Sequence, residues 1–439
     1  MERDLYKQLV QWKNKSNRKP LLLQGARQVG KTYLVNQFGK TEYSQFISLN
    51  FEQDPELKTL FQGNLSAKTV IENIELYIGM KIELENSLIF FDEIQEAEEA
   101  ITSLKYFYEQ ASQYHIIAAG SLLGVSVGKE RSFPVGKVNF ITLYPMSFSE
   151  YLRAFSEELI SEKIKNFQKL EPLPELIHEK LIKHLKMYLF LGGMPEVLQS
   201  YREHKDITLT REIQSDILES YSRDFSKYRD KSQAVKTSEL WNSIPYQLAK
   251  ENKKFKYNSV RKNARALMYE STIEWLNKAG LVYLANNIST PKLPISGYTD
   301  RSKFKLYLFD TGLLGAMLNI SSDIIIKDAA LFSEYNGAFI ENYVASELTI
   351  LGEKELFYWT SKSDAEVDFI IQSNMEIYPL EVKSGLSRNL KSLRSYADKY
   401  KPKLIVRTSP RNFIRSDTFV NLPLYALTLL NRVFIGDLD

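Results

Sequence analysis

One loop near the N-terminus restricts the fold more than any other stretch of this 439-residue chain. The segment KPLLLQGARQVGKTYLVNQF places an apolar strand, residues 21–23, before the pattern G-x-x-x-x-G-K-(S/T), and a helical pattern follows. In this context the glycines let backbone N–H groups turn towards phosphates, and the helix N-terminus adds its positive dipole end. The loop consists of Gly25, Ala26, Arg27, Gln28, Val29, Gly30, Lys31 and Thr32.

This loop predicts a binding site for ATP and Mg²⁺. Lys31 is placed to reach the β- and γ-phosphates, and the Thr32 hydroxyl is placed to ligate Mg²⁺. The alternative is a glycine-rich turn that binds no nucleotide. The strand before the loop and the helix after it favour the nucleotide site.

An acidic pair ends a second apolar run. SLIFFDEIQ carries residues 88–91 as a continuous apolar stretch, which is typical of a buried parallel strand. We expect Asp92 to hold Mg²⁺ through water and Glu93 to polarise the attacking water as a general base. Acidic pairs after strands are common, so the pair indicates ATP hydrolysis only together with the phosphate loop.

Three more strand-like runs complete the N-terminal pattern. Residues 115–120 form one run and end at Ser121, and residues 45–52 and 138–145 form two others. Ser121 either senses the γ-phosphate or caps a following helix in SLLGVS, and the sequence leaves both roles open. Helical segments separate most of the strands, which predicts an α/β fold with a parallel sheet and helices on both faces.

Five motifs together resemble a known family. They are GARQVGKT, LIFFDEIQ, AAGSLLG, LYPMSFSEYL (residues 143–152) and LFLGGMPEVL (residues 189–198). The chain resembles AAA+-like prokaryotic ATPases that carry a C-terminal domain of unknown function, and the likeness covers nearly the whole chain. Relatives often have Gly-Arg just before the LYP-like strand, whereas Lys137 stands here. Arg131 is nearby, and neither residue is assigned as an arginine finger.

The middle of the chain is basic. Residues 221–310 contain 17 Lys and Arg against 8 Asp and Glu, although the net charge of the whole chain is only +3. Within it, Val260, Ala264 and Leu267 at helical spacing predict one helix, STIEWLNKAG predicts a second, and LVYLANN with residues 303–310 predicts a hairpin. Two helices followed by a hairpin predict a winged helix.

Cations surround this predicted winged helix. We expect Arg261, Lys262 and Arg265 to contact DNA phosphates, and Lys253, Lys254 and Lys256 add charge nearby. The alternative is a winged helix that serves only to pack domains together.

The C-terminal segment is predicted to follow the order α-β-β-β-α-β. One predicted strand lies in AEVDFIIQ, and the next strand ends in PLEVKSG. Asp368 and Glu381 lie on successive predicted strands, and Glu381 and Lys383 share one face because strand side chains alternate. Two carboxylates suit Mg²⁺, with Glu341 on the preceding helix as a further ligand, and Lys383 would assist the attacking water.

This arrangement resembles the PD-(D/E)xK nuclease superfamily, with Asp368, Glu381 and Lys383 at its motif positions and Val367 where a Pro is usual. The resemblance implies a metal-dependent phosphodiesterase centre. Two alternatives stay open: a salt bridge on an exposed sheet face, and a domain that only docks DNA or protein.

Composition restricts the remaining possibilities. There is no cysteine, which excludes disulfides and thiolate metal sites, and four scattered histidines do not suggest zinc. The charged N-terminus is not a signal peptide, and no apolar run is long enough to span a membrane, so we expect a cytoplasmic protein with no membrane partner.

We therefore predict an ATPase that binds DNA, with a homo-oligomer as a further possibility. The predicted domains are an ATPase core (residues 1–155), a helical lid (156–205), a basic winged-helix region (206–325) and a nuclease-like domain (326–439). Two rival hypotheses are a nucleotide-dependent switch that does not cleave DNA, and a DNA-binding regulator whose ATPase controls assembly.

Overall fold

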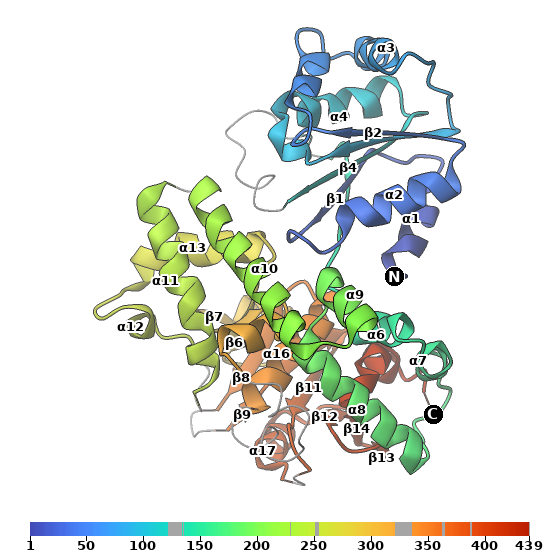
Figure 1. Cartoon of the computed structure of the whole chain (residues 1–439). Coiled ribbons are helices and arrows are strands. Elements are labelled where there is room, and N and C mark those ends of the chain that lie inside the picture. Colours follow the sequence, from blue (N-terminus) through green and yellow to red (C-terminus); the bar gives the residue numbers. More distant parts are fainter. Residues whose placement is uncertain are drawn as a thin grey trace. The chain divides into compact units, whose positions relative to one another are not determined.

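The computed structural model describes residues 1–121, 134, 136–228, 230–250, 254–320, 336–361, 365–386 and 389–438 (Figure 1). The chain forms two compact units. The first comprises Met1–Tyr144 with Lys278–Gly280, and the second comprises Pro145–Asn277 with Leu281–Asp439. The finer division into four domains stays a prediction. Arg131, Lys253 and the SLLGVS segment after Ser121 lie outside the described residues.

The first unit is built on a five-stranded sheet in the order β2-β3-β4-β1-β5, and every pairing is parallel. The sequence prediction of an α/β fold with these five strands is confirmed. The strands are β1 (Leu21–Gly25), β2 (Gln45–Asn50), β3 (Ser87–Asp92), β4 (His115–Ser121) and β5 (Asn139–Thr142). Every residue of β3 and β4 is buried, which explains why both read as continuous apolar runs.

Helices cover both faces of this sheet (Figure 1). They are α1 (Leu5–Lys13), α2 (Lys31–Glu42), α3 (Ala67–Ile78) and α4 (Glu98–Gln110), with the short 3₁₀ turns η1 (Pro55–Phe61) and η2 (Ile94–Glu96). On one face Ile89 and Phe91 join an apolar core with residues of α3 and α4. On the other face α2 lies so close that a Cβ at Gly39 would stand 2.2 Å from the Phe46 ring.

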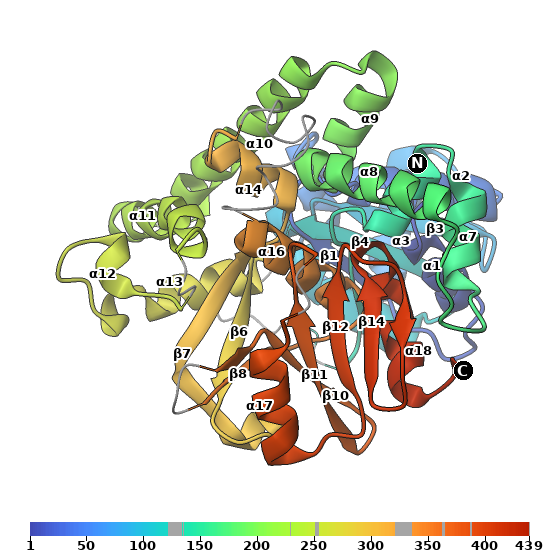
Figure 2. The same cartoon turned by 90° about the horizontal axis from the view of Figure 1, so that it is seen from below.

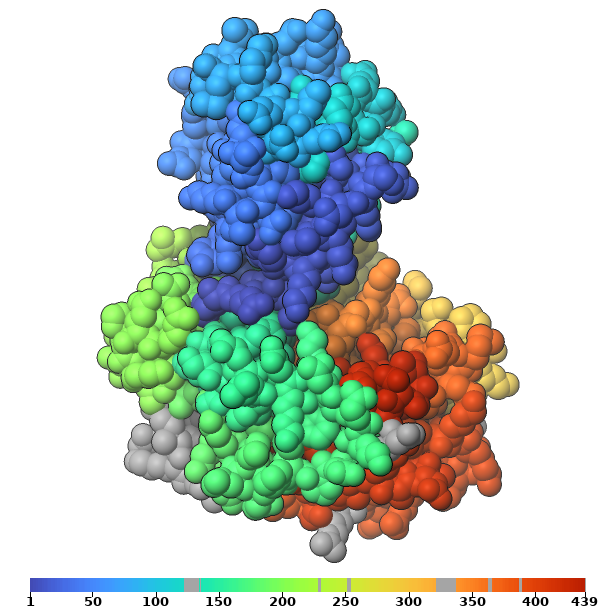
Figure 3. Space-filling model, turned by 90° about the vertical axis from the view of Figure 1, so that its right-hand side faces the viewer, coloured from blue at the N-terminus to red at the C-terminus, as the bar shows by residue number. Residues whose placement is uncertain are grey.

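The second unit begins with a run of helices. These are α6 (Phe148–Ala154), α7 (Glu158–Lys165), α8 (Glu175–Leu191), α9 (Pro195–His204), α10 (Ile207–Tyr228), α11 (Lys231–Leu248), α12 (Tyr257–Val260) and α13 (Ala266–Lys278). The segment predicted as a helical lid contacts the end of the chain: the Leu173 N–H donates to Asn412 at 3.0 Å, and His178 lies 2.8 Å from the Tyr425 hydroxyl. In the space-filling view of Figure 3, green and red segments adjoin.

Two further sheets complete the second unit (Figure 2). One has the order β7-β6-β8-β9 and the other β10-β11-β12-β14-β13. Their strands are β6 (Val282–Ile288), β7 (Thr299–Leu308), β8 (Leu356–Thr360), β9 (Glu366–Val367), β10 (Phe369–Ser373), β11 (Glu376–Val382), β12 (Ile405–Ser409), β13 (Ile414–Arg415) and β14 (Phe419–Pro423). The accompanying helices and turns are η3 (Ile295–Tyr298), α14 (Thr311–Met317), α16 (Asn336–Ile350), α17 (Lys391–Tyr400), η4 (Leu424–Leu429) and α18 (Leu430–Ile435).

The first of these sheets crosses a predicted domain boundary. β6 and β7 pair antiparallel, as the predicted hairpin requires, but β6 also pairs in parallel with β8, from Ala285 opposite Leu356 to Ile288 opposite Trp359. The predicted boundary at residue 325 therefore falls between strands of one sheet.

The first helix of the predicted winged helix is not formed as expected. α12 ends at Val260, and residues 261–265 form turns in which Asn263 has a φ of 65°. This left-handed backbone cannot continue a right-handed helix, so a new helix starts at Ala266. Leu267 is 90% exposed rather than part of an apolar face. The second predicted helix, STIEWLNKAG, falls within α13.

Helix α16 also differs from its prediction. The sequence predicts an amphipathic helix, but α16 is buried on all sides over most of its length. Its polar side chains have partners: Asn342 accepts from the Leu308 N–H at 2.7 Å and donates to the Leu308 carbonyl at 2.9 Å. Glu347 accepts from the Phe148 N–H at 2.9 Å. On the side that the sequence predicts to be exposed, hydrogen bonds to other parts of the protein thus take the place of hydrogen bonds to water.

The GGMPEV break between α8 and α9 has a steric cause. The Asp310 carboxylate accepts from the Gly193 N–H at 2.6 Å and from the Leu313 N–H at 2.9 Å, which caps α14. A Cβ at Gly192 would stand 2.2 Å from Asp310, and one at Gly193 would stand 2.2 Å from the Met146 carbonyl oxygen. Two glycines are therefore required where this buried carboxylate meets the chain.

Candidate functional sites

The phosphate loop lies between the end of β1 and the start of α2. Gly25 faces the Leu143 carbonyl oxygen so closely that a Cβ would stand 2.3 Å from it. Gly30 caps α2 with a φ of 93°, a conformation that favours glycine. The two glycines of the motif are thus required by the backbone, and the loop leads into the N-terminus of a twelve-residue helix.

Lys31 is buried in this loop, with 6% of its surface exposed. Its ammonium donates to the Ala26 carbonyl at 2.8 Å and to the Gly25 carbonyl at 3.3 Å. Burial lowers the pKa of Lys31 to about 8, although Glu93 and Asp92 oppose the shift. An ammonium that lacks close carboxylate partners in a buried loop is suited to bind phosphate oxygens.

Asp92 ends β3 beside the loop. Its carboxylate accepts from the Thr32 hydroxyl at 2.9 Å and from the Asn50 side-chain amide at 3.1 Å. Burial raises the pKa of Asp92, and the Thr32 hydrogen bond opposes the shift. The adjacent Thr32 and Asp92 oxygens are hard donors of the kind that Mg²⁺ prefers, so these residues fit the predicted metal.

Glu93 is connected to Ser121 through a residue to which the sequence analysis gave no role. The Gln95 side-chain amide donates to the Glu93 carboxylate at 2.5 Å, and the Gln95 oxygen accepts from the Ser121 N–H at 3.2 Å. Glu93 itself has a φ of 51°, a strained value for a non-glycine residue. The DEIQ motif contained Gln95, but its spacing alone does not reveal this contact.

Arg3 is a second residue that sequence reasoning missed. It is 6% exposed, and its guanidinium donates to the Val29 carbonyl at 2.9 Å and to the Tyr144 carbonyl at 2.6 Å. It therefore ties the phosphate loop to the residue at which the first unit ends.

The predicted DNA-binding cations lie on the turn between α12 and α13. Arg261, Lys262 and Arg265 are all exposed. The Arg261 guanidinium lies 3.8 Å from Glu239, a loose contact for an ion pair with 64% of the Arg261 side chain exposed. The structure thus brings the three cations together on one exposed turn, away from the α-helical face that the sequence suggested.

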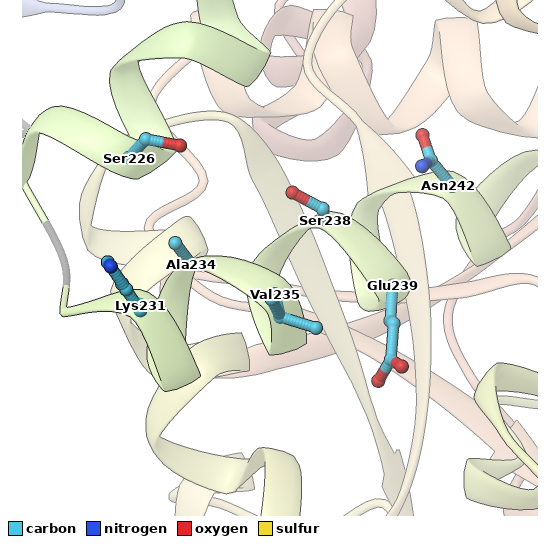
Figure 4. Close-up of a pocket in the computed structure, with 7 residues that line it drawn as sticks. All are labelled: Ser226, Lys231, Ala234, Val235, Ser238, Glu239 and Asn242. Carbon is cyan, nitrogen blue, oxygen red and sulfur yellow. The ribbon is translucent and has the colours of Figure 1, made fainter.

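A hollow of about 510 Å³ lies beside this turn, on α10 and α11 (Figure 4). None of the predicted site residues lines it. Its lining residues are Ser226, Lys231, Ala234, Val235, Ser238, Glu239 and Asn242.

The predicted nuclease-like residues lie close together, just before the start of β10 and around the end of β11. The Asp368 carboxylate accepts from the Val382 N–H at 2.8 Å, and the Lys383 ammonium lies 2.6 Å from Glu381 Oε1. Glu381 is 4% exposed, and its Oε2 has no hydrogen-bond partner within the described part of the chain. Burial raises the pKa of Glu381, while Lys383 opposes the shift. A buried carboxylate oxygen without a partner fits a divalent cation.

The third predicted ligand, Glu341, has other partners. Its Oε2 accepts from the Tyr307 hydroxyl at 3.1 Å and lies 3.3 Å from the ammonium of Lys305, a residue of β7 that the sequence analysis did not single out. Over the described ranges, no three His, Cys, Asp or Glu side chains gather closely enough to hold a metal ion. Metal binding by Asp368, Glu381 and Glu341 stays a prediction.

Comparisons with known proteins agree with the fold of the first unit. Residues 17–152 match a family described as an AAA domain, and residues 182–324 and 336–427 match two families described as domains of unknown function, DUF8612 and DUF4143. The first match covers the phosphate loop and the parallel sheet of the first unit. None of the described helices is both long and apolar enough to cross a membrane.

Among curated relatives, the chain is 25% identical to the uncharacterized protein MJ1544 of Methanocaldococcus jannaschii, over 80% of this chain and 71% of that protein. It is 29% identical to the uncharacterized protein Rv2008c of Mycobacterium tuberculosis, over 30% of each chain. Among solved structures, the Walker-type ATPase PABY2304 of Pyrococcus abyssi aligns at 13% identity and a TM-score of 0.44, over 72% of this chain and 95% of that one.

The link from Glu93 through Gln95 to Ser121 leads to a testable prediction. Gln95→Ala should lower kcat for ATP hydrolysis on the order of tenfold, because Glu93 loses the donor that orients its carboxylate. The KM for ATP should not change, since the Gln95 side chain contacts Glu93 and Ser121 rather than the phosphate loop. Steady-state kinetics of the full chain measure both constants. Gln62→Ala, at an exposed glutamine of the same unit, is the control, and equal kcat for both variants would contradict the role.

Proposed function

We propose that this protein binds and hydrolyses ATP with Mg²⁺ at the phosphate loop. The observation that supports the proposal is the meeting of Lys31, Thr32, Asp92 and Glu93 at the carboxyl ends of β1 and β3, with Thr32 and Asp92 only 2.9 Å apart. Mg²⁺, when bound, neutralises charge on the phosphates. Thr32 and Asp92 would hold this ion, and Lys31 would bind the phosphate oxygens.

Glu93 would then accept a proton from the attacking water. One carboxylate oxygen is fixed by Gln95, which leaves the other to orient the water. Ser121, at the end of β4, would report the γ-phosphate to Glu93 through the same glutamine.

Two substitutions separate binding from turnover. Lys31→Ala should abolish ATP hydrolysis without unfolding the protein, because it removes the charge that binds phosphate. Glu93→Gln should keep ATP binding and lower kcat by roughly 10²-fold or more, since it removes the general base. Phosphate release and nucleotide binding are measured on the same preparations.

The matched control is Lys40→Ala, at an exposed lysine of the same helix as Lys31. It should leave both quantities unchanged. Hydrolysis at the parent rate by Glu93→Gln would show that Glu93 is not the base.

We further propose that the exposed turn with Arg261, Lys262 and Arg265 contacts the DNA backbone. Its support is the grouping of three exposed cations between α12 and α13, the helix that precedes the β6–β7 hairpin along the chain. The alternative is a packing module, in which the cations are only solvated.

Reversal of these three charges should weaken duplex binding and reduce its salt dependence. Each lost phosphate contact lowers the slope of log K against log salt by about 0.9. Fluorescence anisotropy at several salt concentrations measures the slope. Reversal of the exposed cations Arg394, Lys399 and Lys401 is the control, and an unchanged slope for the first triple variant would exclude this DNA surface.

For the C-terminal residues we propose a metal-dependent phosphodiesterase centre, in which Asp368 and Glu381 hold a divalent cation and Lys383 assists the attacking water. The unpartnered Oε2 of buried Glu381 supports it. A docking module that does not cleave DNA is the second candidate, because Lys383 is already paired with Glu381 at 2.6 Å.

Thermal melting distinguishes the metal centre from a structural ion pair. Mn²⁺ should raise the Tm of the parent, and the double variant Asp368→Asn with Glu381→Gln should lose this rise while melting no lower than the metal-free parent, since carboxylate repulsion is removed. A structural ion pair predicts no Mn²⁺ effect and a lower Tm for the variant, which leaves Lys383 unpaired. Plasmid nicking with Mn²⁺, lost in Lys383→Ala, would then distinguish cleavage from docking.

A further inference from the structure

Lys305 is a fully buried lysine at the edge of the proposed metal centre. None of its side chain is exposed, and its ammonium lies 2.6 Å from the Glu366 carboxylate and 3.3 Å from that of Glu341. The three residues come from β7, β9 and α16. The ammonium also lies 5.1 Å from the centre of the Tyr358 ring on β8.

The charge of Lys305 is retained despite this burial. Burial alone would lower its pKa, but the Glu341 carboxylate, followed by Tyr307 and Glu366, raises the pKa well above the ordinary value. Asp368 acts in the same direction, which places Lys305 within the electrostatic reach of a proposed metal ligand. Lys305 thus lies among two carboxylates and an aromatic ring that come from α16, β9 and β8.

The carboxylates around Lys305 are arranged as they would be around a metal ion. Phosphodiesterase centres that use two metal ions hold them about 3.5–4 Å apart and share carboxylates between them. Here Glu341 and Glu366 direct oxygens at an ammonium, and the Tyr307 hydroxyl donates to the same Glu341 oxygen at 3.1 Å. Glu341 Oε2 is thus occupied by donors that belong to the protein itself.

We propose that the Lys305 ammonium takes the place of a second divalent cation. The centre then binds a single divalent ion through Asp368 and Glu381, and Glu341 is not one of its ligands. This inference rests on the metal centre proposed above and adds its stoichiometry. The inference applies to Lys305 and not to Lys303, which lies two residues earlier on the same strand. The Lys303 side chain is 58% exposed and pairs with Asp300.

The test counts bound Mn²⁺ by electron paramagnetic resonance on the full chain without nucleotide. Mn²⁺ held elsewhere is measured on the Asp368→Asn, Glu381→Gln variant and subtracted. The parent should bind one ion, and Lys305→Met should bind one more, because Glu341 and Glu366 lose their counter-charge. Lys305→Arg, which keeps the charge, and Lys303→Met, on the same strand, should each bind one.

A second variant keeps the inference testable if Lys305→Met does not fold with or without Mn²⁺. Glu341→Gln retains Lys305 and should bind one Mn²⁺ like the parent, since Glu341 is not a ligand. Loss of that ion would overturn the inference, as would two ions in the parent or no gain in a folded Lys305→Met protein.

The same counts separate this inference from the metal centre itself. No ion in the parent but one in Lys305→Met would reject the proposed Asp368–Glu381 site and still support the substitution of a cation by Lys305. One ion in the parent and one in Lys305→Met would leave the metal centre intact and reject the role of Lys305.

Discussion

Burying an ammonium ion costs several kcal/mol unless carboxylates or other acceptors accompany it, and the chain buries one lysine in the phosphate loop and another beside the proposed metal centre. The surroundings decide what each lysine does. At Lys31 desolvation outweighs Asp92 and Glu93, and the pKa falls to about 8. At Lys305 the carboxylates prevail and the pKa rises. Lys31 donates to the backbone carbonyls of Gly25 and Ala26, whereas Lys305 is paired with carboxylates of the protein.

The parallel sheet of the first unit brings residues that are far apart in the sequence together at one edge. Because all five strands run the same way, the ends of β1, β3 and β4 lie at one edge, and this edge receives the phosphate loop, Asp92 and Ser121. The Gln95 amide spans from Glu93 to the backbone of Ser121, so one side chain connects the end of β4 with the residue that follows β3.

The sequence predicted what local pattern determines and missed what distant residues supply. The strands were predictable from their apolar runs, which are continuous in the fully buried β3 and β4, and the loop was predictable because its glycines are required sterically. Arg3, whose partner Tyr144 is 141 positions away, left no local signal. Lys305 was equally hidden: it shares one face of its strand with Lys303 and Tyr307, and only its contacts with Glu366 and Glu341 distinguish it from a solvated lysine.

Periodicity also misled in two places, for physical reasons. The spacing of Val260, Ala264 and Leu267 suggested one helix, but the left-handed Asn263 interrupts it. In α16 the polar positions suggested an exposed face, but Asn342 and Glu347 are satisfied by backbone groups of β7 and of residue 148. A hydrophobic pattern indicates which apolar residues are buried, but it does not indicate which polar residues form hydrogen bonds in the interior.

The pairing of β6 with β8 has a consequence for how such proteins change over time. β6 lies within the region that matches one domain of unknown function, and β8 lies within the region that matches the other. The border between two recognised domains thus runs through a ladder of backbone hydrogen bonds. A recombination event that exchanged one region alone would leave four residues of β8 without their partner strand. The unpaired backbone groups of that edge would then be available to pair with strands of other chains. The two regions must therefore be inherited together, as one evolutionary unit.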